Sequence, residues 1–310
     1  MAKLLIYGAS GYTGTLISHH LKCLGLDFVL AGRSKPKLAN LATTLKLPFC
    51  VFDLGDRRLI DNNLHGATVL LNCAGPYMHT AEPLIEACIH NGVHYLDARQ
   101  AGVMLLPGCG GISAMLECLA ARAAEQVNDP VRIDIAIHLA GPTSRGTIIS
   151  ARESVNASFL QRVDGELVEQ ELSATEQFDF EDGKGHVACL PMSLPNLIIL
   201  WRSMHVKNIR TFVHTSGGAF SDGEVDALPD GPTAEERDAN PYHAVVAVTG
   251  KDGTTKREVL HTVNGYAFTF ITSAKAAQGV LAGETRGGFE TSAGLFGHEF
   301  IFEMTERNDV

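Results

Sequence analysis

The sequence lacks the cysteine pattern of a disulfide-linked or zinc-binding protein. Its seven cysteines are scattered along the chain, and no two of them form a C-x-x-C pair. The H-E-x-x-H, G-x-S-x-G and EF-hand patterns are also absent, so no motif supports a metalloprotease, a serine hydrolase or a calcium-binding protein. We therefore expect no bound metal ion and a reducing compartment such as the cytoplasm.

Long apolar runs and excess basic charge are also missing. No apolar stretch reaches the roughly 18 residues that a membrane span needs, and residues 1–3 lead into a strand without a signal-peptide pattern. The 25 Lys and Arg residues stand against 35 Asp and Glu, a formal charge of -10. This balance disfavours nucleic acid or an anionic membrane surface as the main partner. We expect a soluble protein of two domains, since 310 residues can bury two modest cores.

A glycine-rich turn directly follows the first apolar run, residues 4–7. Gly8, Gly11 and Gly14 stand there, ahead of a helical pattern of Leu and Ile. The order of strand, glycine turn and helix is the context that a dinucleotide site requires. Here the first glycine allows the tight turn, the second admits a pyrophosphate and the third lets helix and strand pack closely. The spacing differs from the common G-x-G-x-x-G form, so the alternative is a turn that binds nothing.

The residues after the second predicted strand, 28–31, indicate which nucleotide is bound. Enzymes that use NAD usually place an acidic residue there, whereas this chain has Arg33 and Ser34. A guanidinium and a hydroxyl suit the 2′-phosphate of NADP, and the alternative is an exposed basic loop without a ligand. Asp53 ends the third predicted strand, where it could contact the adenine ribose or cap the next helix.

The fourth predicted strand, 68–73, ends in a loop that should face the nicotinamide. Ligands of doubly wound sheets lie beyond the carboxyl ends of the strands, and this loop carries Tyr77 and His79. Each is a candidate proton donor, or alternatively a wall of the pocket. A helix is expected at 80–91, with a proline in its first turn.

The connection after the fifth predicted strand, 93–96, is unusually short. Tyr95 in this strand and Asp97 at its end are further candidate proton donors. Six residues separate the strand from the next apolar run, 103–106, whereas a parallel crossover normally takes a dozen or more. Either these two strands are not parallel neighbours, or a segment is missing between Asp97 and Ala98.

Together these motifs resemble the saccharopine dehydrogenase-like oxidoreductases, which include NADP-binding reductases and trans-acting enoyl reductases. The segments that carry the resemblance lie within the first 118 residues, at 8–14, 32–34, 72–77, 94–97 and 102–108. The resemblance implies an α/β fold, with a Rossmann-type doubly wound parallel sheet and a second α+β domain that carries a mixed or antiparallel sheet. It further implies NADP(H), hydride transfer to a C=C, C=N or C=O bond of a small molecule, and a homodimer through the second sheet.

Site residues follow from the same resemblance by position. The pyrophosphate would lie against Gly8, Ser10, Gly11, Tyr12, Thr13 and Gly14, the 2′-phosphate against Arg33 and Ser34, and the nicotinamide side against Cys73, Ala74, Gly75 and Pro76. Members of the family usually have a helix after the strand that ends at Asp97, and this chain nearly lacks it. None of these motifs identifies the substrate.

Two other functions remain open. The opening motif is also similar to that of the acyl-phosphate reductases of arginine biosynthesis, whose nucleophilic cysteine lies in a Pro-Gly-Cys loop, here Cys109. The positive end of the dipole of the helix predicted at 112–125 would activate a thiolate there. However, Gly110 and Gly111 stand where that family has an aromatic residue and a proline. The other possibility is a non-catalytic NADPH-binding sensor or scaffold protein.

The second half of the chain is rich in predicted strands. We expect an NADP-binding domain at 1–128, rejoined by 268–310, and a substrate and dimerisation domain at 129–267. Arg145 lies in a polar loop before a short strand predicted at 148–150, and it could bind an anionic substrate group. The alternative is a solvated loop arginine.

Overall fold

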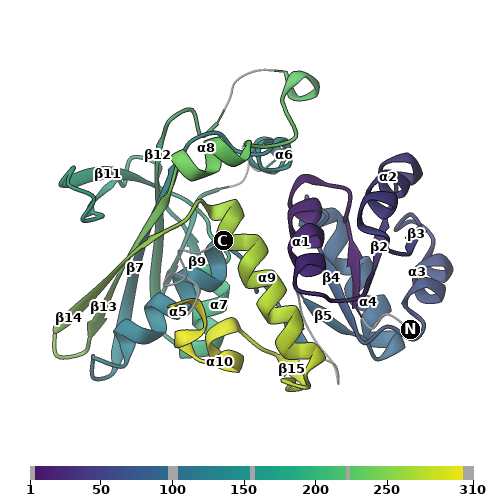
Figure 1. The fold of residues 1–310 in the computed structure, drawn as a ribbon. Coiled ribbons are helices and arrows are strands. Elements are labelled where there is room, and N and C mark those ends of the chain that lie inside the picture. The colour runs from purple at the N-terminus through teal and green to yellow at the C-terminus, as the bar shows by residue number, and fades with distance from the viewer. Residues whose placement is uncertain (1–3, 97–103, 154–157, 221–223, 303–310) are drawn as a thin grey trace.

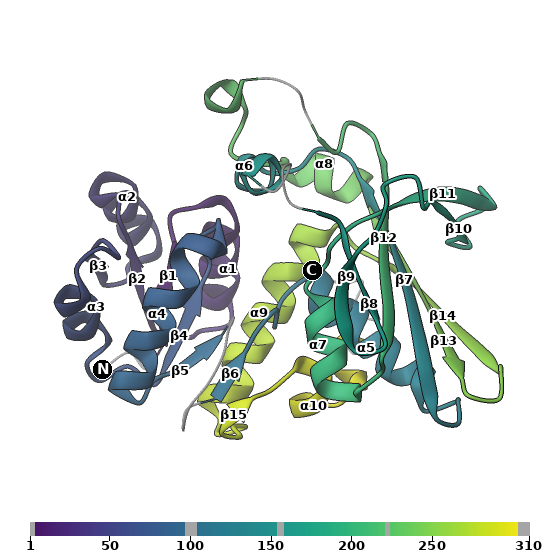
Figure 2. The same cartoon turned by 180° about the vertical axis from the view of Figure 1, so that it is seen from behind.

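The computed structural model describes residues 4–96, 104–153, 158–220 and 224–302 of the chain. These residues form two β-sheets with helices packed on them, and the sheets lie side by side (Figure 1). A long helix, α9 (Gly265–Leu281), runs between the sheets and packs against α1 (Tyr12–Cys23). Figure 2 shows the same arrangement from behind. No helix within these ranges is long and apolar enough to cross a membrane.

The first sheet, within the described residues, has seven strands that all pair in parallel. Its order is β15-β6-β5-β4-β1-β2-β3. The strands are β1 (Leu4–Tyr7), β2 (Phe28–Gly32), β3 (Phe49–Val51), β4 (Val69–Asn72), β5 (His94–Leu96), β6 (Met104–Leu106) and β15 (Gly288–Phe289). Because β1 lies between β2 and β4, the strand order reverses there, which defines the switch point of a doubly wound sheet. The predicted Rossmann-type sheet is confirmed.

Both faces of this sheet are buried, which explains its continuous apolar strands. In β1, Leu4 and Ile6 belong to one hydrophobic core and Leu5 and Tyr7 to another, because successive strand side chains point to opposite faces. On the first face lie α1 and α2 (Lys35–Leu45), and on the second lie α3 (Arg57–Leu64) and α4 (Tyr77–Asn91). Helix α4 starts three residues earlier than predicted, directly after Pro76.

The strands β5 and β6 are parallel neighbours, with Leu96 opposite Leu106. The alternative that they are not parallel neighbours is therefore wrong. Residues 97–103 connect them and lie outside the described residues. The proposed gap between Asp97 and Ala98 lies outside the described residues.

The second sheet is mixed, as predicted, and its described part has eight strands. Its order is β10-β11-β12-β7-β13-β14, with β8 pairing to β12 and β9 to β8. The strands are β7 (Pro130–Ala140), β8 (Leu160–Val163), β9 (Glu166–Glu169), β10 (Glu176–Asp179), β11 (His186–Pro191), β12 (Asn208–Ser216), β13 (Tyr242–Gly250) and β14 (Thr255–Thr262). Only β12 and β7 pair in parallel within it.

Helices cover one face of the second sheet. The long α5 (Ile112–Ala124) packs on β13 and β14, and α7 (Asn196–Met204) packs on β12. The remaining short helices are α6 (Arg145–Glu153), α8 (Ala234–Ala239), α10 (Ser292–Phe296), η1 (Val225–Ala227) and η2 (His298–Ile301). On the opposite face, Phe180 packs with Ala136, Phe212 and Val245 in a separate small core.

The short strand predicted at 148–150 is wrong, since these residues belong to α6. The hydroxyl of Ser144 accepts a hydrogen bond from the backbone N–H of Thr147 at 3.2 Å, as an N-cap does. The cap starts a helix and outweighs the β-preference of the two following isoleucines. Arg145 is therefore the first residue of a helix and not part of a loop.

Candidate functional site

The glycine turn brings three chain segments into close contact at the switch point. Gly8 has a φ of 80°, and a Cβ there would lie 2.7 Å from the backbone nitrogen of Ala74, after β4. A Cβ at Gly14 would lie 2.2 Å from the carbonyl oxygen of Gly8. Any side chain at either position would push β1 away from β4, or α1 away from β1.

The start of α1 is suited to an anion. Gly11 is its N-cap residue, it contributes no side-chain cap, and the first turn carries no acidic residue. The first backbone N–H groups of a helix have no partners within the helix, and they add to the positive end of its dipole. The cradle formed by Gly8, Gly11 and Gly14 therefore fits a pyrophosphate group.

The two charged candidates for the adenosine end lie near each other at the ends of β2 and β3. Burial raises the pKa of Tyr7 to about 12, with the charge of Arg33 acting to lower it and that of Asp53 to raise it, so both charges are close to the end of β1. Arg33 is exposed. The cap of α3 is Asp56, which accepts from two backbone N–H groups, so the prediction of Asp53 as the cap is wrong. Asp53 instead accepts from the N–H of Gly55 at 2.8 Å.

A cavity of about 380 Å³ opens beyond the carboxyl ends of β4, β5 and β6. Residues from both halves of the chain line it: Thr13, Ile17, Leu71, Asn72, Cys73, Tyr77, Ala81, Leu96, Pro107, Gly108, Cys109, Gly110, Ser113, Pro195, Ile198, Ile199, Thr269, Ser273 and Phe289. None of these described residues carries a charge. Apolar side chains dominate, with hydroxyl groups and one amide among them. The cavity therefore suits a neutral, largely apolar molecule.

Four residues predicted from sequence meet at this cavity. Thr13 lies in the first turn of α1, Cys73 follows β4, Tyr77 begins α4 and Cys109 follows β6. The hydroxyl of Tyr77 lies 3.5 Å from the carbonyl oxygen of Asn72, to which it donates. Tyr77 is the one candidate proton donor among the described lining residues.

The other candidate donors are placed elsewhere. Tyr95 is fully buried, and its hydroxyl accepts from the side-chain amide of Asn72 at 2.9 Å. His79 is largely exposed and faces Glu153 of α6, at 3.3 Å. Arg145 forms an ion pair with Asp230. Asp97 lies outside the described residues.

The Pro-Gly-Cys loop packs tightly on α9. A Cβ at Gly110 would lie 2.1 Å from the hydroxyl oxygen of Ser273, and one at Gly111 would lie 2.3 Å from that of Thr269. Gly111 also has a φ of 65° and donates its N–H to Thr272 at 2.9 Å. An aromatic residue and a proline could not fit here, which explains why the chain departs from the acyl-phosphate reductase pattern at this loop.

Tyr12 connects the glycine turn to the second half of the chain. Its hydroxyl donates to the carbonyl oxygen of Pro232 at 2.5 Å and accepts from the guanidinium of Arg237 at 2.9 Å. Its ring also contacts that of Tyr266 edge-on, with 5.2 Å between centroids. Sequence reasoning missed Arg237. The capping box of Thr233 and Glu236 was a local signal for the helix that carries it.

Sequence reasoning also missed the wall of the cavity that α9 provides. Thr269 and Ser273 both line the cavity from that helix. Their spacing of four residues in a largely apolar helix puts both hydroxyls on one face, and this was the available signal.

Comparison with known proteins identifies the first half of the chain. Residues 4–132 match the family model described as the saccharopine dehydrogenase NADP binding domain. A saccharopine dehydrogenase-like oxidoreductase from Homo sapiens is 33% identical over 113 residues, which cover 30% of this chain and 26% of that protein. A trans-acting enoyl reductase from Mycobacterium leprae (strain TN) is 32% identical over 101 residues, which cover 30% of this chain and 24% of that protein. The matches thus span about a quarter of the length of these curated relatives.

The whole fold has a counterpart among solved structures. Apo histidine-tagged saccharopine dehydrogenase (L-Glu forming) from Saccharomyces cerevisiae superposes with a TM-score of 0.67, covering 98% of this chain and 96% of that chain. The two sequences are 13% identical, so the likeness establishes a shared fold. The family resemblance inferred from the motifs is confirmed by these matches, together with NADP(H) as the nucleotide.

Proposed function

Because residues 4–132 form an NADP-binding domain of the saccharopine dehydrogenase family, we propose that the protein is an NADPH-dependent reductase of neutral, largely apolar small molecules. The observation that carries this proposal is the cavity of about 380 Å³ between the ends of the first sheet and helix α9. It adjoins the cradle for the pyrophosphate through Thr13, so a nicotinamide would reach it. The cofactor, when bound, supplies a hydride for a C=C, C=N or C=O bond.

The residues around the cavity would have separate roles. Ile17, Ile199 and Phe289 exclude water, and the hydroxyl groups of Thr269 and Ser273 orient a polar atom of the substrate. Tyr77 would donate the proton that completes the reduction, with the carbonyl oxygen of Asn72 fixing its hydroxyl. We also propose that the residues inferred from the family motifs, from Gly8 to Gly14 and at Arg33, Ser34 and Cys73 to Pro76, bind the nucleotide.

Matched substrate pairs test the proposal. NADPH oxidation is followed by absorbance with enoyl, imine and carbonyl compounds, each offered as a neutral form and as a form bearing a carboxylate. We expect turnover of at least one neutral compound, at a kcat/KM about tenfold or more above that of its charged partner, because the carboxylate would be buried without a cation. A preference for the charged forms would contradict the proposed substrate class.

Two alternative functions predict different results in these assays. Tight NADPH binding without turnover of any compound would favour a non-catalytic sensor. An acyl-phosphate reductase is supported by the position of Cys109 on the cavity wall, yet no described lining residue offers a positive charge for the phosphate. Activity on an acyl phosphate that is lost in Cys109→Ser would establish that alternative.

We also propose a homodimer through the second sheet and a location in the cytoplasm. Among the described residues, strand β9 pairs with β8 alone and thus forms an edge, and Val163, Leu167 and Val168 of these two strands are exposed apolar residues. Light scattering coupled to size-exclusion chromatography would measure the mass, and a monomer would contradict the dimer. Cell fractionation tests the location.

A further inference from the structure

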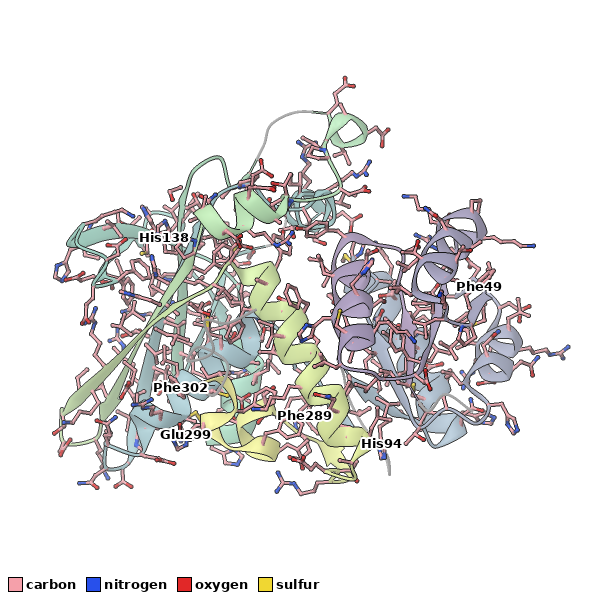
Figure 3. The ribbon with its side chains drawn as sticks, viewed as in Figure 1. Phe49, His94, His138, Phe289, Glu299 and Phe302 are labelled. Carbon is pink, nitrogen blue, oxygen red and sulfur yellow. The ribbon has the colours of Figure 1, made fainter. Side chains whose placement is uncertain are left out.

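Four histidines form one row across the second sheet. His214 of β12 stands opposite His138 of β7, which stands opposite His243 of β13, which stands opposite His261 of β14. Residues paired in register project from the same face, so all four imidazoles lie together. Their ring centroids are 4.9, 5.7 and 4.5 Å apart in that order. Figure 3 labels His138 on the second sheet, away from Phe49 at the edge of the first.

The two inner histidines carry unpaired nitrogen atoms. His138 is only 3% exposed, and its Nε2 atom lies 2.7 Å from the hydroxyl oxygen of Ser216. The Nδ1 atoms of His138 and His243 are both buried without a hydrogen-bond partner among the described residues. Buried polar atoms nearly always have a hydrogen-bond partner, so two buried nitrogens without one on adjacent strands need an explanation.

The two outer histidines differ in this respect. His261 Nε2 lies 2.6 Å from the carbonyl oxygen of Phe180, and His214 Nδ1 lies 3.1 Å from that of Ala188. The contact of His261 holds the turn between β10 and β11 over the row, and that of His214 holds β11 itself. Both outer imidazoles are therefore engaged by backbone groups, and His214, which does not contact the turn, serves as an internal control for the inner ones.

A carboxylate from that turn lies close to the two inner imidazoles. One ligand atom each from His138, His243 and Asp182 lies within 4.8 Å of the other two. Asp182 already attracts a cation, since the ammonium of Lys184 lies 2.9 Å from its Oδ2 atom. Lys184 is mostly exposed and can move into solvent. The small core around Phe180 lies on this same face, opposite the face that α5 and α7 cover.

We propose that His138, His243 and Asp182 bind a divalent transition-metal ion, with zinc as the best match. Two imidazoles and one carboxylate are ligands that zinc accepts, with water in the fourth position of a tetrahedron. With a metal ion on Nδ1, the Nε2–H of His138 would donate to the hydroxyl of Ser216, which lies 2.7 Å away, and this is the outer contact that metal-binding histidines usually have. The ion would replace the ammonium of Lys184 and fix the turn between β10 and β11 to the sheet.

Zinc titration of the metal-free protein tests this proposal. Protein dialysed against a chelator is titrated with Zn²⁺ in competition with a chromophoric chelator. We expect one ion per chain, and binding weaker by about 30-fold or more in Asp182→Asn and in His243→Ala, since each removes a ligand. His214→Ala serves as the control from the same row and should bind zinc as the wild type does, because His214 contacts β11 and not the turn that carries Asp182.

Lys184→Met provides a test in the opposite direction. Removing the competing ammonium should tighten zinc binding by about 3- to 10-fold, because a positive charge near the ion opposes it. Thermal melting without metal verifies that each variant folds, and added zinc should raise the melting temperature of the wild type but not that of Asp182→Asn. No saturable binding tighter than about 10 µM, or equal losses in His214→Ala and Asp182→Asn, would overturn the proposal.

Discussion

The two ends of the proposed nucleotide site differ in charge. At the adenosine end, Arg33 and Asp53 place opposite charges near the end of β1. At the nicotinamide end, the described residues around the cavity carry no charge at all. The first end is suited to recognise the cofactor by charge, and the second to hold a neutral substrate in a region of low polarity.

This difference separates cofactor choice from substrate choice. The charges of the adenosine end are exposed to solvent and belong to the loops after β2 and β3, whereas the cavity depends on α7 and α9 from the rest of the chain. A substitution at one end should therefore leave the other end unchanged. Paired measurements of NADPH affinity and of kcat can test that independence.

The largest effect is expected from Tyr77→Phe. Losing a general acid lowers kcat by about 100- to 10,000-fold, while the affinity for NADPH should not change because the aromatic ring remains. Stopped-flow single turnovers with a substrate found in the panel would measure the chemical step. His79→Gln is the control, since His79 lies outside the described cavity wall and should leave kcat unaltered. Full activity of Tyr77→Phe would show that the proton comes from another group.

Arg33→Asp should affect binding and not the chemical step. Replacing a bidentate, charge-assisted contact with a repulsive charge costs on the order of 2–4 kcal/mol, or about 30- to 1000-fold in NADPH affinity. NADH binding should weaken little, and kcat at saturating NADPH should persist. Lys46→Asp changes the net charge equally at an exposed position after α2, so it controls for long-range electrostatics. Equal losses for both cofactors would refute the role of Arg33.

Glu117 should affect stability without affecting either end of the site. Burial raises the pKa of this carboxyl group on α5 to about 7. Hydrogen bonds from residues in and next to α10 act in the opposite direction and lower the pKa, but burial has the larger effect. Folding thus favours the protonated form, so this group contributes stability below about pH 4.5 that is lost as the pH rises to about 7, roughly 3 kcal/mol in all. Glu117→Gln should melt higher than the wild type at pH 8 and equally at pH 4.

The control for this pH effect is Glu82→Gln, an exposed carboxylate on α4. It should melt as the wild type does at both pH values. The melting temperatures of the wild type and of Glu117→Gln are compared at pH 5 and at pH 8. If the wild type does not fall below the variant over this range, the fold does not hold Glu117 protonated. NADPH affinity and kcat should be the same in all three proteins.

The smallest effect separates two neighbouring aspartates. Asp56→Ala removes the cap of α3 and should cost about 1 kcal/mol of stability, with NADPH affinity unchanged. Asp53→Ala should cost less stability, because Asp53 caps no helix, and any change in NADPH affinity would then come from the adenosine end. Denaturant unfolding and cofactor titration of both variants distinguish the two roles. A reversed pattern would assign the ribose contact to Asp56.

The first sheet was largely predictable because short stretches of sequence identify its strands and turns. Strands buried on both faces read as unbroken apolar runs, and glycines such as Gly8 and Gly14 mark the turns that need them. Local signals failed where a cap overrode residue preference, as Ser144 does for the helix α6. The domain division into 1–128 with 268–310 and 129–267 stays a prediction.

The cavity and the histidine row were not predictable, for different reasons. Ile199 and Ser273 reach the cavity from segments far along the chain and carry no motif of their own. His138 and His243 each stand alone in a strand, and only the pairing of β7 with β13 brings them together. Register between distant strands is a property of the assembled sheet, and no spacing in the sequence encodes it.

The position of β15 has a consequence for the order of synthesis. This two-residue strand joins β6 at the edge of the first sheet, and the N–H of Glu290 donates to the carbonyl oxygen of Leu105 at 2.9 Å. A ribosome needs roughly 10 to 40 s to add the 181 residues from 107 to 287 that separate them, at 5–20 residues per second. For that time the edge of β6 lacks its partner, so the nascent chain must keep a nearly finished sheet open while it makes the second one.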